Sequence, residues 1–304
     1  MPSHWHRLGL VGSATSRAEW AVSHSALPAL ATTPEGTCHL YVSTRDGEGR
    51  ARIARGRFAL DPTPAFEPIE PEPVLDLGAL GTFDDRGVTM SSIVMEGGRT
   101  YLYYTGWMLG VTVPFYLGTG LAISDDGGLT FRRLSAAPLL DRNDVDPFLT
   151  ASPFVMVDNG VWRMWYVSGS DWQIVDGSPR HSYHIKYAES RNGVDWIRRG
   201  HVCLDFASPE EHAFARPCVR YDGQVYRMWY AYRGHRYRIG YAESADGLTW
   251  TRRDHERGLE ASGAGWDSEM VEYPWVFESN GREYMLYNGD DYGRTGVGLA
   301  VWQA

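Results

Sequence analysis

The stretch that decides the fold is VYRMWYAYRGHRYRIGYAESADGLTWTRR, residues 225–253, because residues 161–199 repeat it. The two copies share the run Arg-Met-Trp-Tyr, then Tyr-Ala-Glu-Ser, then a tryptophan followed closely by arginine. The pairs Asp246-Gly247 and Asn192-Gly193 separate the last two runs, and such pairs supply the positive φ angles of a tight hairpin turn. Each copy therefore predicts an antiparallel β-meander.

The aromatic run of this repeat recurs five times along the chain. Its tyrosines are 63, 62, 64 and 57 residues apart, at Tyr41, Tyr104, Tyr166, Tyr230 and Tyr287. Five copies at this spacing are typical of a β-propeller, in which each four-stranded sheet buries its faces against its neighbours. We therefore expect an all-β fold, a five-bladed β-propeller, with residues 1–304 forming a single domain.

The ends of the chain indicate how the ring closes. The outer strand of three copies reads FRR (131–133), WIR (196–198) and WTR (250–252), whereas the fifth copy stops at 297–302, one strand short. HWHR at 4–7 has the missing pattern. We expect the N-terminal strand to join the last blade and leave no open sheet edge there, the alternative being a disordered N-terminal tail.

Composition and net charge argue against several classes of function. The chain of 304 residues is 43% hydrophobic, which suffices for a full core. A net charge of -9 and a pI near 5.6 argue against a nucleic-acid or anionic-membrane partner. No run approaches the roughly 18 apolar residues of a membrane span, and the N-terminus lacks the apolar core of a signal peptide, so we expect a cytoplasmic protein. Three cysteines without metal-ligand spacing predict free thiols, and nothing indicates the oligomeric state.

Propeller geometry restricts the search for a site. The first strand of each blade starts at the mouth of the central channel and the second strand returns to it, so residues at those places converge. The side chains that this rule selects are His24, Arg45, Trp107, His184, Arg216, Arg233 and Glu272. Loops that lead to first strands add the acids Asp84, Asp146 and Glu269. Taken singly, such an acid more often caps backbone N–H groups, and a lone histidine on a strand more often packs in the core.

These residue types support two kinds of binding. Mixed carboxylate and imidazole ligands suit Mg²⁺ or Mn²⁺, with Asp146, His184 and Glu269 as candidates. Arginine forks bind phosphate oxygens, so Arg45, Arg216 and Arg233 are candidate substrate ligands, unless they pair with nearby acids. Trp107 and Tyr116 are candidates for stacking on a sugar face or a base. If arginines and an ion share a pocket, a diphosphate ligand fits better than a neutral polysaccharide.

The sequence resembles the five-bladed propeller glycosidases that act on fructans, arabinans and xylans. The resemblance lies in the regular spacing of the repeats, in the x-Pro pairs at strand openings and in the run Ala-Glu-Ser-x-Asp-Gly-x-x-Trp. In that family, carboxylates stand at three of the channel-mouth openings. The matching positions here are Leu27, Ser152 and Arg216, each before a proline, and only Glu272 in the last blade is acidic. A glycosidase needs two carboxyl groups flanking the bond, so the resemblance implies the architecture more than the active site.

A closer resemblance lies in the motifs SHSALP (23–28), STRD (43–46), GTFDDRG (81–87), GLAISDDGG (120–128) and GWDSEMVEYPWVF (265–277). They resemble propeller proteins of bacterial sugar-nucleotide pathways, a group similar to the flavin-independent, divalent-metal-dependent mutases that interconvert pyranose and furanose forms of GDP-hexoses. The resemblance implies an isomerase whose substrate is a nucleotide sugar and whose cofactor is Mn²⁺ or Mg²⁺. The lack of a Gly-x-Gly-x-x-Gly or Walker pattern gives flavin, NAD and NTP hydrolysis no support.

In such a mutase, the ion would offset the charge of the departing diphosphate. Glu272, Asp84 or His24 would then deprotonate the hydroxyl that closes the smaller ring. Two alternatives stay open: a glycoside hydrolase or phosphorylase with relocated carboxylates, and a non-catalytic sugar-binding propeller.

Overall fold

β-Strands make up nearly all of the regular structure, as the repeat predicts. The structure, a computed structural model, describes residues 3–304 except 17, 34–35 and 69–70. The helical segments are single turns: α1 (Asp254–Arg257), α2 (Asp290–Gly293) and the 3-10 turn η1 (Gly265–Asp267). None of the described helices has the length and hydrophobicity that crossing a bilayer requires.

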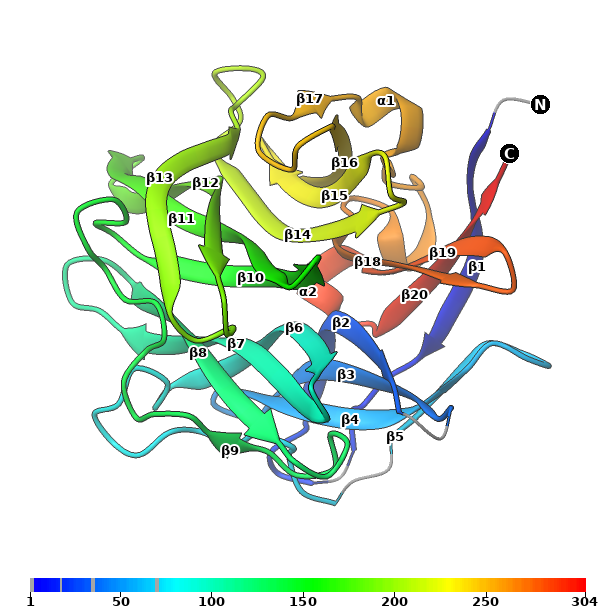
Figure 1. Ribbon diagram of the computed structural model, residues 1–304, viewed down its shortest axis with the longest axis horizontal. Coiled ribbons are helices and arrows are strands. Elements are labelled where there is room, and N and C mark those ends of the chain that lie inside the picture. Colours follow the sequence, from blue (N-terminus) through cyan, green and yellow to red (C-terminus); the bar gives the residue numbers. More distant parts are fainter. Residues whose placement is uncertain (1–2, 17, 34–35, 69–70) are drawn as a thin grey trace.

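The described strands form three four-stranded sheets and one eight-stranded sheet (Figure 1). The eight-stranded sheet consists of two antiparallel meanders that a single parallel bridge joins, between Tyr183 and Ala213, so we divide the strands into five meanders, numbered 1 to 5. Meander 1 contains β2 (Ser23–Thr32), β3 (Cys38–Arg45), β4 (Ala51–Ala59) and β5 (Ala65–Pro68). Meander 2 contains β6 (Gly87–Glu96), β7 (Arg99–Leu109), β8 (Phe115–Ser124) and β9 (Arg132–Arg133). Meander 3 contains β10 (Thr150–Asp158), β11 (Val161–Val175), β12 (Ser178–Ser190) and β13 (Trp196–Leu204). Meander 4 contains β14 (Ala213–Tyr221), β15 (Tyr226–Arg233), β16 (Tyr237–Ser244) and β17 (Thr251–Arg252). Meander 5 contains β18 (Glu272–Ser279), β19 (Arg282–Asn288), β20 (Val297–Gln303) and β1 (His4–Gly12).

The N-terminal strand belongs to the last meander. β1 runs antiparallel to β20, from His4 opposite Gln303 to Gly12 opposite Val297. Trp5 is buried, and its ring centroid lies 5.2 Å from that of Trp302. The pairing that residues 4–7 predicted is therefore present.

The first strands of the meanders gather in the middle of the molecule (Figure 1). β2 contacts β6, β6 contacts β10, β10 contacts β14, β14 contacts β18, and β18 contacts β2. Hydrogen bonds reinforce this order: Thr105 Oγ1 of meander 2 accepts from the backbone N–H of Ser152 in meander 3 (2.9 Å). Asn288 Oδ1 of meander 5 accepts from the backbone N–H of Leu27 in meander 1 (2.9 Å). The last meander is thus bonded to the first.

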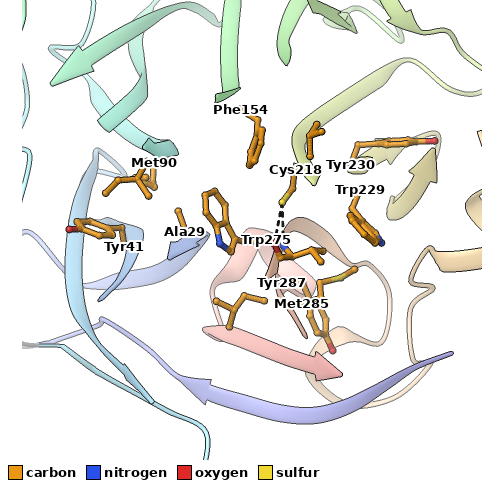
Figure 2. Close-up of a cluster of buried hydrophobic side chains, with 14 of the residues drawn as sticks. Ala29, Tyr41, Met90, Phe154, Cys218, Trp229, Tyr230, Trp275, Met285 and Tyr287 are labelled. Carbon is orange, nitrogen blue, oxygen red and sulfur yellow. Dashed lines mark hydrogen bonds between the residues drawn. The ribbon is translucent and has the colours of Figure 1, made fainter. Parts of the chain in front are cut away.

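Apolar side chains fill the space between these strands. Ala29, Phe154, Cys218 and Trp275, from four different first strands, lie close together in Figure 2. The ring centroids of Phe154 and Trp275 are 5.7 Å apart. Cys218 Sγ accepts a hydrogen bond from the backbone N–H of Val276 (3.2 Å), so this amide is satisfied within the apolar centre. As predicted, the cysteines are free thiols.

A group of three residues, which we call the Asp–Tyr–Arg clasp, recurs in four meanders. In meander 2, Asp84 accepts hydrogen bonds from the hydroxyl of Tyr104 (2.9 Å) and from Nε of Arg133 (2.8 Å). The other clasps are Asp146, Tyr166 and Arg198; Asp254, Tyr230 and Arg252; and Asp267, Tyr287 and Arg7. The tyrosine comes from the second strand and the arginine from the outer strand. In these four meanders the aspartate therefore links the outer strand to the second strand through hydrogen bonds.

The aromatic run of meander 1 is shifted by one residue from the register that the spacing predicted. The hydroxyl of Tyr41 donates to the carbonyl of a turn glycine in the next meander (3.1 Å), and that of Tyr103 does the same (2.7 Å). Tyr41 therefore corresponds to Tyr103 and not to Tyr104. Val42 takes the place of the clasp tyrosine in meander 1.

Candidate functional site

One pocket draws residues from all five meanders. Its volume is about 280 Å³, and it is located where the first strands begin and the second strands end. No aspartate or glutamate occurs among the described residues that line it. Its larger polar and aromatic side chains are Arg45, Trp107, Phe115, His181, Tyr183, Arg233, Tyr237, Tyr273 and Tyr292.

The wall of this pocket contains strained backbone. Four first strands have a β-bulge at a residue that precedes proline, and that residue has a positive φ angle: Leu27 (57°), Ser152 (45°), Arg216 (50°) and Tyr273 (58°). Non-glycine residues in this region are strained, and such strain clusters at functional sites. The bulges therefore mark the pocket wall as a specialised part of the fold.

The bulges also show that the sequence comparison placed Glu272 one position out of register with the other first strands. Tyr273, and not Glu272, is the residue of meander 5 that precedes proline. Glu272 is opposite Asn288 in the ladder, one position earlier, where Ala151 and Ala215 stand in meanders 3 and 4. These two alanines line the pocket, so Glu272 lies beside the pocket wall, although it is not among the described residues that line the pocket.

Glu272 is a fully buried carboxyl group, and among the described residues neither of its oxygens has a hydrogen-bond partner within normal geometry. Burial raises the pKa of Glu272 well above its ordinary value, against the smaller opposite effects of Tyr273, Arg233 and Arg45. Because an ionised carboxylate is costly in such a place, the acid form persists to higher pH than in water. Glu272 is thus a buried carboxyl group whose acid form is favoured, close to residues that line the pocket.

Arg45 and Arg233 make the pocket cationic. Asp46 forms its salt bridges with other arginines, and within the described part of the chain neither Arg45 nor Arg233 forms an ion pair. The Arg233 guanidinium lies 3.3 Å from the Tyr292 hydroxyl and 5.5 Å from the centroid of the Tyr237 ring. Both predicted pocket arginines are therefore available to an anionic ligand.

His181 and Tyr183 form the wall on the side of the long hairpin β11–β12. Their rings are stacked, with centroids 4.2 Å apart and planes 9° apart. Burial, with help from the charges of His212, Arg233 and Arg180, lowers the pKa of His181 to about 4. The imidazole is therefore neutral at pH 7 and offers both a donor and an acceptor nitrogen.

A second hollow, the basic groove, adjoins the pocket. It measures about 530 Å³ and lies between the tip of the β11–β12 hairpin and the turn that joins β15 to β16. His181 and Arg233 line both hollows. The other basic residues of the groove are Arg180, His212, His235 and Arg236.

The prediction that Arg216 lies at the rim of the pocket is wrong. Its guanidinium is 1% exposed and donates to the backbone carbonyls of Met90 (3.0 Å), Ser91 and Pro28 (2.7 Å). It also lies 5.5 Å from the centroid of the Trp275 ring. Arg216 thus holds first strands together, because its two terminal nitrogens donate to backbone carbonyl oxygens.

Two acids predicted for chemistry are clasp residues. Asp84, 1% exposed, is bonded to Tyr104 and Arg133, and Asp146, 0% exposed, to Tyr166, Ser168, Lys186 and Arg198. Asp84 therefore does not reach the pocket as a catalytic base, since its oxygens are taken by structural donors.

The proposed metal ligands do not form a cluster. Asp146 is bonded to two cationic side chains, Glu269 is exposed and pairs with Arg236 (3.0 Å), and His184 faces Asp205 (3.4 Å). Among the described residues, no group of three or more His, Cys, Asp or Glu is placed to hold an ion. Asp146, His184 and Glu269 therefore do not fit the Mn²⁺ or Mg²⁺ that the resemblance implies.

Of the remaining predicted residues, one lines the pocket and two lie outside its lining. Trp107 lines the pocket, with its indole N–H donating to Thr89 Oγ1 (3.0 Å). His24 lies on β2 outside the lining, and burial followed by the charges of Arg45 and Arg294 lowers its pKa to about 4. Tyr116 belongs to a different hollow, under the guanidinium of Arg142.

Sequence reasoning missed the tyrosines of the pocket. Tyr273 has a signal in the sequence, since it precedes a proline as Leu27, Ser152 and Arg216 do. Tyr237 opens the third strand of meander 4, a place that the same geometric rule covers. Tyr292 follows the last second strand and had no comparable signal, because its turn has no counterpart in the other meanders.

The fold is similar to that of several solved glycoside hydrolases. The chain has a TM-score of 0.74 to a glycoside hydrolase, at 17% identity, covering 97% of this chain and 91% of that protein. A thermostable family-43 glycoside hydrolase gives 0.66 at 16% identity, over 95% and 91%. Zg3597, a family 117 glycoside hydrolase produced by the marine bacterium Zobellia galactanivorans, gives 0.64 at 12%, over 99% and 90%. At these identities the likeness shows the fold alone.

No family model matches the sequence. The chain is 42% identical over 297 residues to two uncharacterized proteins of Mycobacterium tuberculosis, MT1551 and Rv1502, covering 98% of this chain and of each relative. The chain belongs to the family of these mycobacterial proteins.

Proposed function

We propose that the protein acts at the anomeric carbon of a sugar, with a phosphate group as the reacting partner bound in the central pocket. The observation that carries this proposal is the presence of Arg45 and Arg233, without ion pairs, in a pocket whose described lining has no carboxylate. Hydrolysis needs a pair of carboxyl groups beside the bond. A phosphate held by arginines replaces one of them, because it brings its own nucleophilic oxygen.

The first form of this chemistry is phosphorolysis of a glycoside, which the likeness to glycoside hydrolases favours. An oxygen of inorganic phosphate attacks the anomeric carbon, and the bond from that carbon to the glycosidic oxygen breaks. The departing oxygen takes the proton of Glu272, and solvent later restores it. The products are a sugar 1-phosphate and the shortened saccharide. A carboxyl group with a raised pKa suits the role of general acid.

The second form is the interconversion of pyranose and furanose rings in a nucleotide sugar. The basic groove beside the pocket favours it, since a nucleotide sugar brings more negative charge than one phosphate. The bond between the anomeric carbon and the phosphate oxygen breaks and forms again after the ring has changed size, so the composition of the sugar is unchanged. No step is assigned to a metal ion, because Asp146, His184 and Glu269 do not fit one.

We also infer that the five meanders are five blades of one propeller, closed by β1. Two observations support this. The first strands contact one another in cyclic order, and Arg7 of β1 fills the clasp position that Arg133, Arg198 and Arg252 fill from the outer strands of their own meanders.

The test is an activity screen with two arms. One arm incubates the protein with oligosaccharides, with and without inorganic phosphate, and looks for sugar 1-phosphates. The other uses GDP- and UDP-hexoses, with and without Mn²⁺, and looks for furanose isomers. Product in either arm supports the proposal and selects its form. Release of free sugar without phosphate, or no product in either arm, contradicts it.

Two variants connect activity with the residues. We expect Glu272→Gln to lower kcat by about 100-fold or more, the usual contribution of a general acid. Arg45→Gln is expected to raise KM for phosphate or for the nucleotide sugar with a smaller effect on kcat. Arg99→Gln, which removes an exposed surface arginine, is the matched control. Unchanged turnover in Glu272→Gln would exclude the assigned proton donor.

A further inference from the structure

Ion pairs within the described lining of the basic groove do not neutralise the positive charge of its arginines. Arg180 is exposed and forms no ion pair within the described residues, and Arg233 also lacks one. Asp176 is the single acid in the described lining, and the partner of Arg236, Glu269, is outside it. An open hollow with unneutralised guanidinium groups attracts anions from solution.

The groove and the central pocket share two side chains. Arg233 and His181 line both hollows, so an anion bound in the pocket and an anion bound in the groove would both contact Arg233. The guanidinium carries five N–H donors, enough for two neighbouring anionic groups. The two hollows are therefore parts of one continuous surface.

Two histidines of the groove, His181 and His212, act as neutral hydrogen-bonding groups. Burial lowers the pKa of His212 below its ordinary value, as it does for His181. The His212 Nδ1 lies 3.3 Å from the backbone carbonyl of Glu210, which leaves Nε2 for a ligand. The positive charge of the groove that binds anions at pH 7 is thus assigned to its arginines and not to His181 or His212.

We propose that the groove is a second anion subsite, in which Arg180, Arg233 and Arg236 bind a phosphate-type group of the same ligand whose reacting phosphate lies in the central pocket. The ligand class is a sugar compound with two neighbouring anionic groups. This inference rests on the proposed function, since the first anion is the reacting phosphate.

The test is calorimetric titration of the full chain with inorganic phosphate and with pyrophosphate. We expect pyrophosphate to bind about tenfold more tightly than phosphate, as one additional charge-assisted contact allows. Arg180→Gln is expected to remove most of this difference and to leave phosphate affinity unchanged, whereas Arg45→Gln weakens both. Arg191→Gln, an exposed arginine outside both hollows, is the control.

The outcomes separate the two proposals. If Arg45→Gln weakens both probes while Arg180→Gln and Arg236→Gln both bind pyrophosphate like the wild type, the groove inference is overturned and the proposed function stands. If the wild type binds neither probe, both are overturned. Loss of the pyrophosphate preference in Arg180→Gln, with an unchanged melting temperature, supports the groove.

Discussion

Glu272 is the residue whose environment departs most from what its chemistry prefers. It is fully buried and, within the described part of the chain, without a hydrogen-bond partner in normal geometry, so folding favours its protonated form. The pKa of Glu272 is raised in the folded state, and the native protein therefore binds more protons than the unfolded chain at pH values between the ordinary pKa and the raised one. In that window, stability falls as pH rises, by up to about 1.4 kcal/mol per pH unit.

Replacing Glu272 with glutamine should remove this pH dependence. We expect Glu272→Gln to match the wild type near the ordinary glutamate pKa and to become progressively more stable than the wild type as pH rises from there toward the raised pKa. Urea denaturation at each pH measures the difference. Glu278→Gln, which changes a more exposed glutamate in the same strand, should follow the wild type. Parallel stability curves for Glu272→Gln and the wild type would show that Glu272 is ionised in the native state.

At the residue scale, the sequence predicted the types of residue that line the pocket. It was less successful in predicting which position of each strand faces the pocket. Arg45, Trp107 and Arg233 were found because they end second strands. Tyr273 was missed because a one-residue bulge reverses which side chain faces the axis, and hydrophobic alternation does not reveal a bulge. Asp84 was misassigned because a loop acid looks the same in sequence whether it faces a ligand or a tyrosine.

At the scale of elements, the clasps explain how short outer strands stay on their sheets. β9 and β17 have only two residues each, too few for a stable ladder of their own. Their arginines reach an aspartate, buried Asp84 for β9 and partly exposed Asp254 for β17, that also binds a tyrosine of the second strand. The repeat predicted the strands and the place of β1, because Arg7 aligns with these arginines, but the aspartate that joins them lies outside the repeated runs.

The clasp of meander 5 provides a test of this account. Arg7→Met leaves the buried Asp267 without its cationic partner, which is bonded at 2.8 Å. We expect a loss of about 1–2 kcal/mol in the free energy of unfolding, less than for a fully buried pair because Arg7 is about a third exposed. Arg99→Met, which breaks an exposed ion pair, should cost less than about 1 kcal/mol. Equal effects in a denaturant titration would mean that the clasp is only a surface contact.

At the scale of the whole molecule, Arg216 joins meander 4 to three other meanders through one side chain. It projects from β14 of meander 4 to carbonyls of β6 and β2, and its guanidinium lies over Trp275 of meander 5. No sequence pattern distinguishes such a residue from a substrate arginine, because both stand at the opening of a first strand. The difference depends on the bulge, which places the side chain among backbone carbonyls and away from the pocket lining.

Arg216→Met should therefore destabilise the fold without weakening the pocket. Several buried carbonyls would lose their donor, and leaving such groups unsatisfied costs about 1–3 kcal/mol each before relaxation, so we expect a loss of about 3 kcal/mol or more. Arg220→Met, in the same strand but half-exposed, should cost less than about 1 kcal/mol. Phosphate affinity of folded Arg216→Met, measured by calorimetry, should equal that of the wild type. A stable Arg216→Met variant that no longer binds phosphate would instead make Arg216 a ligand-binding residue and contradict its placement among the first strands.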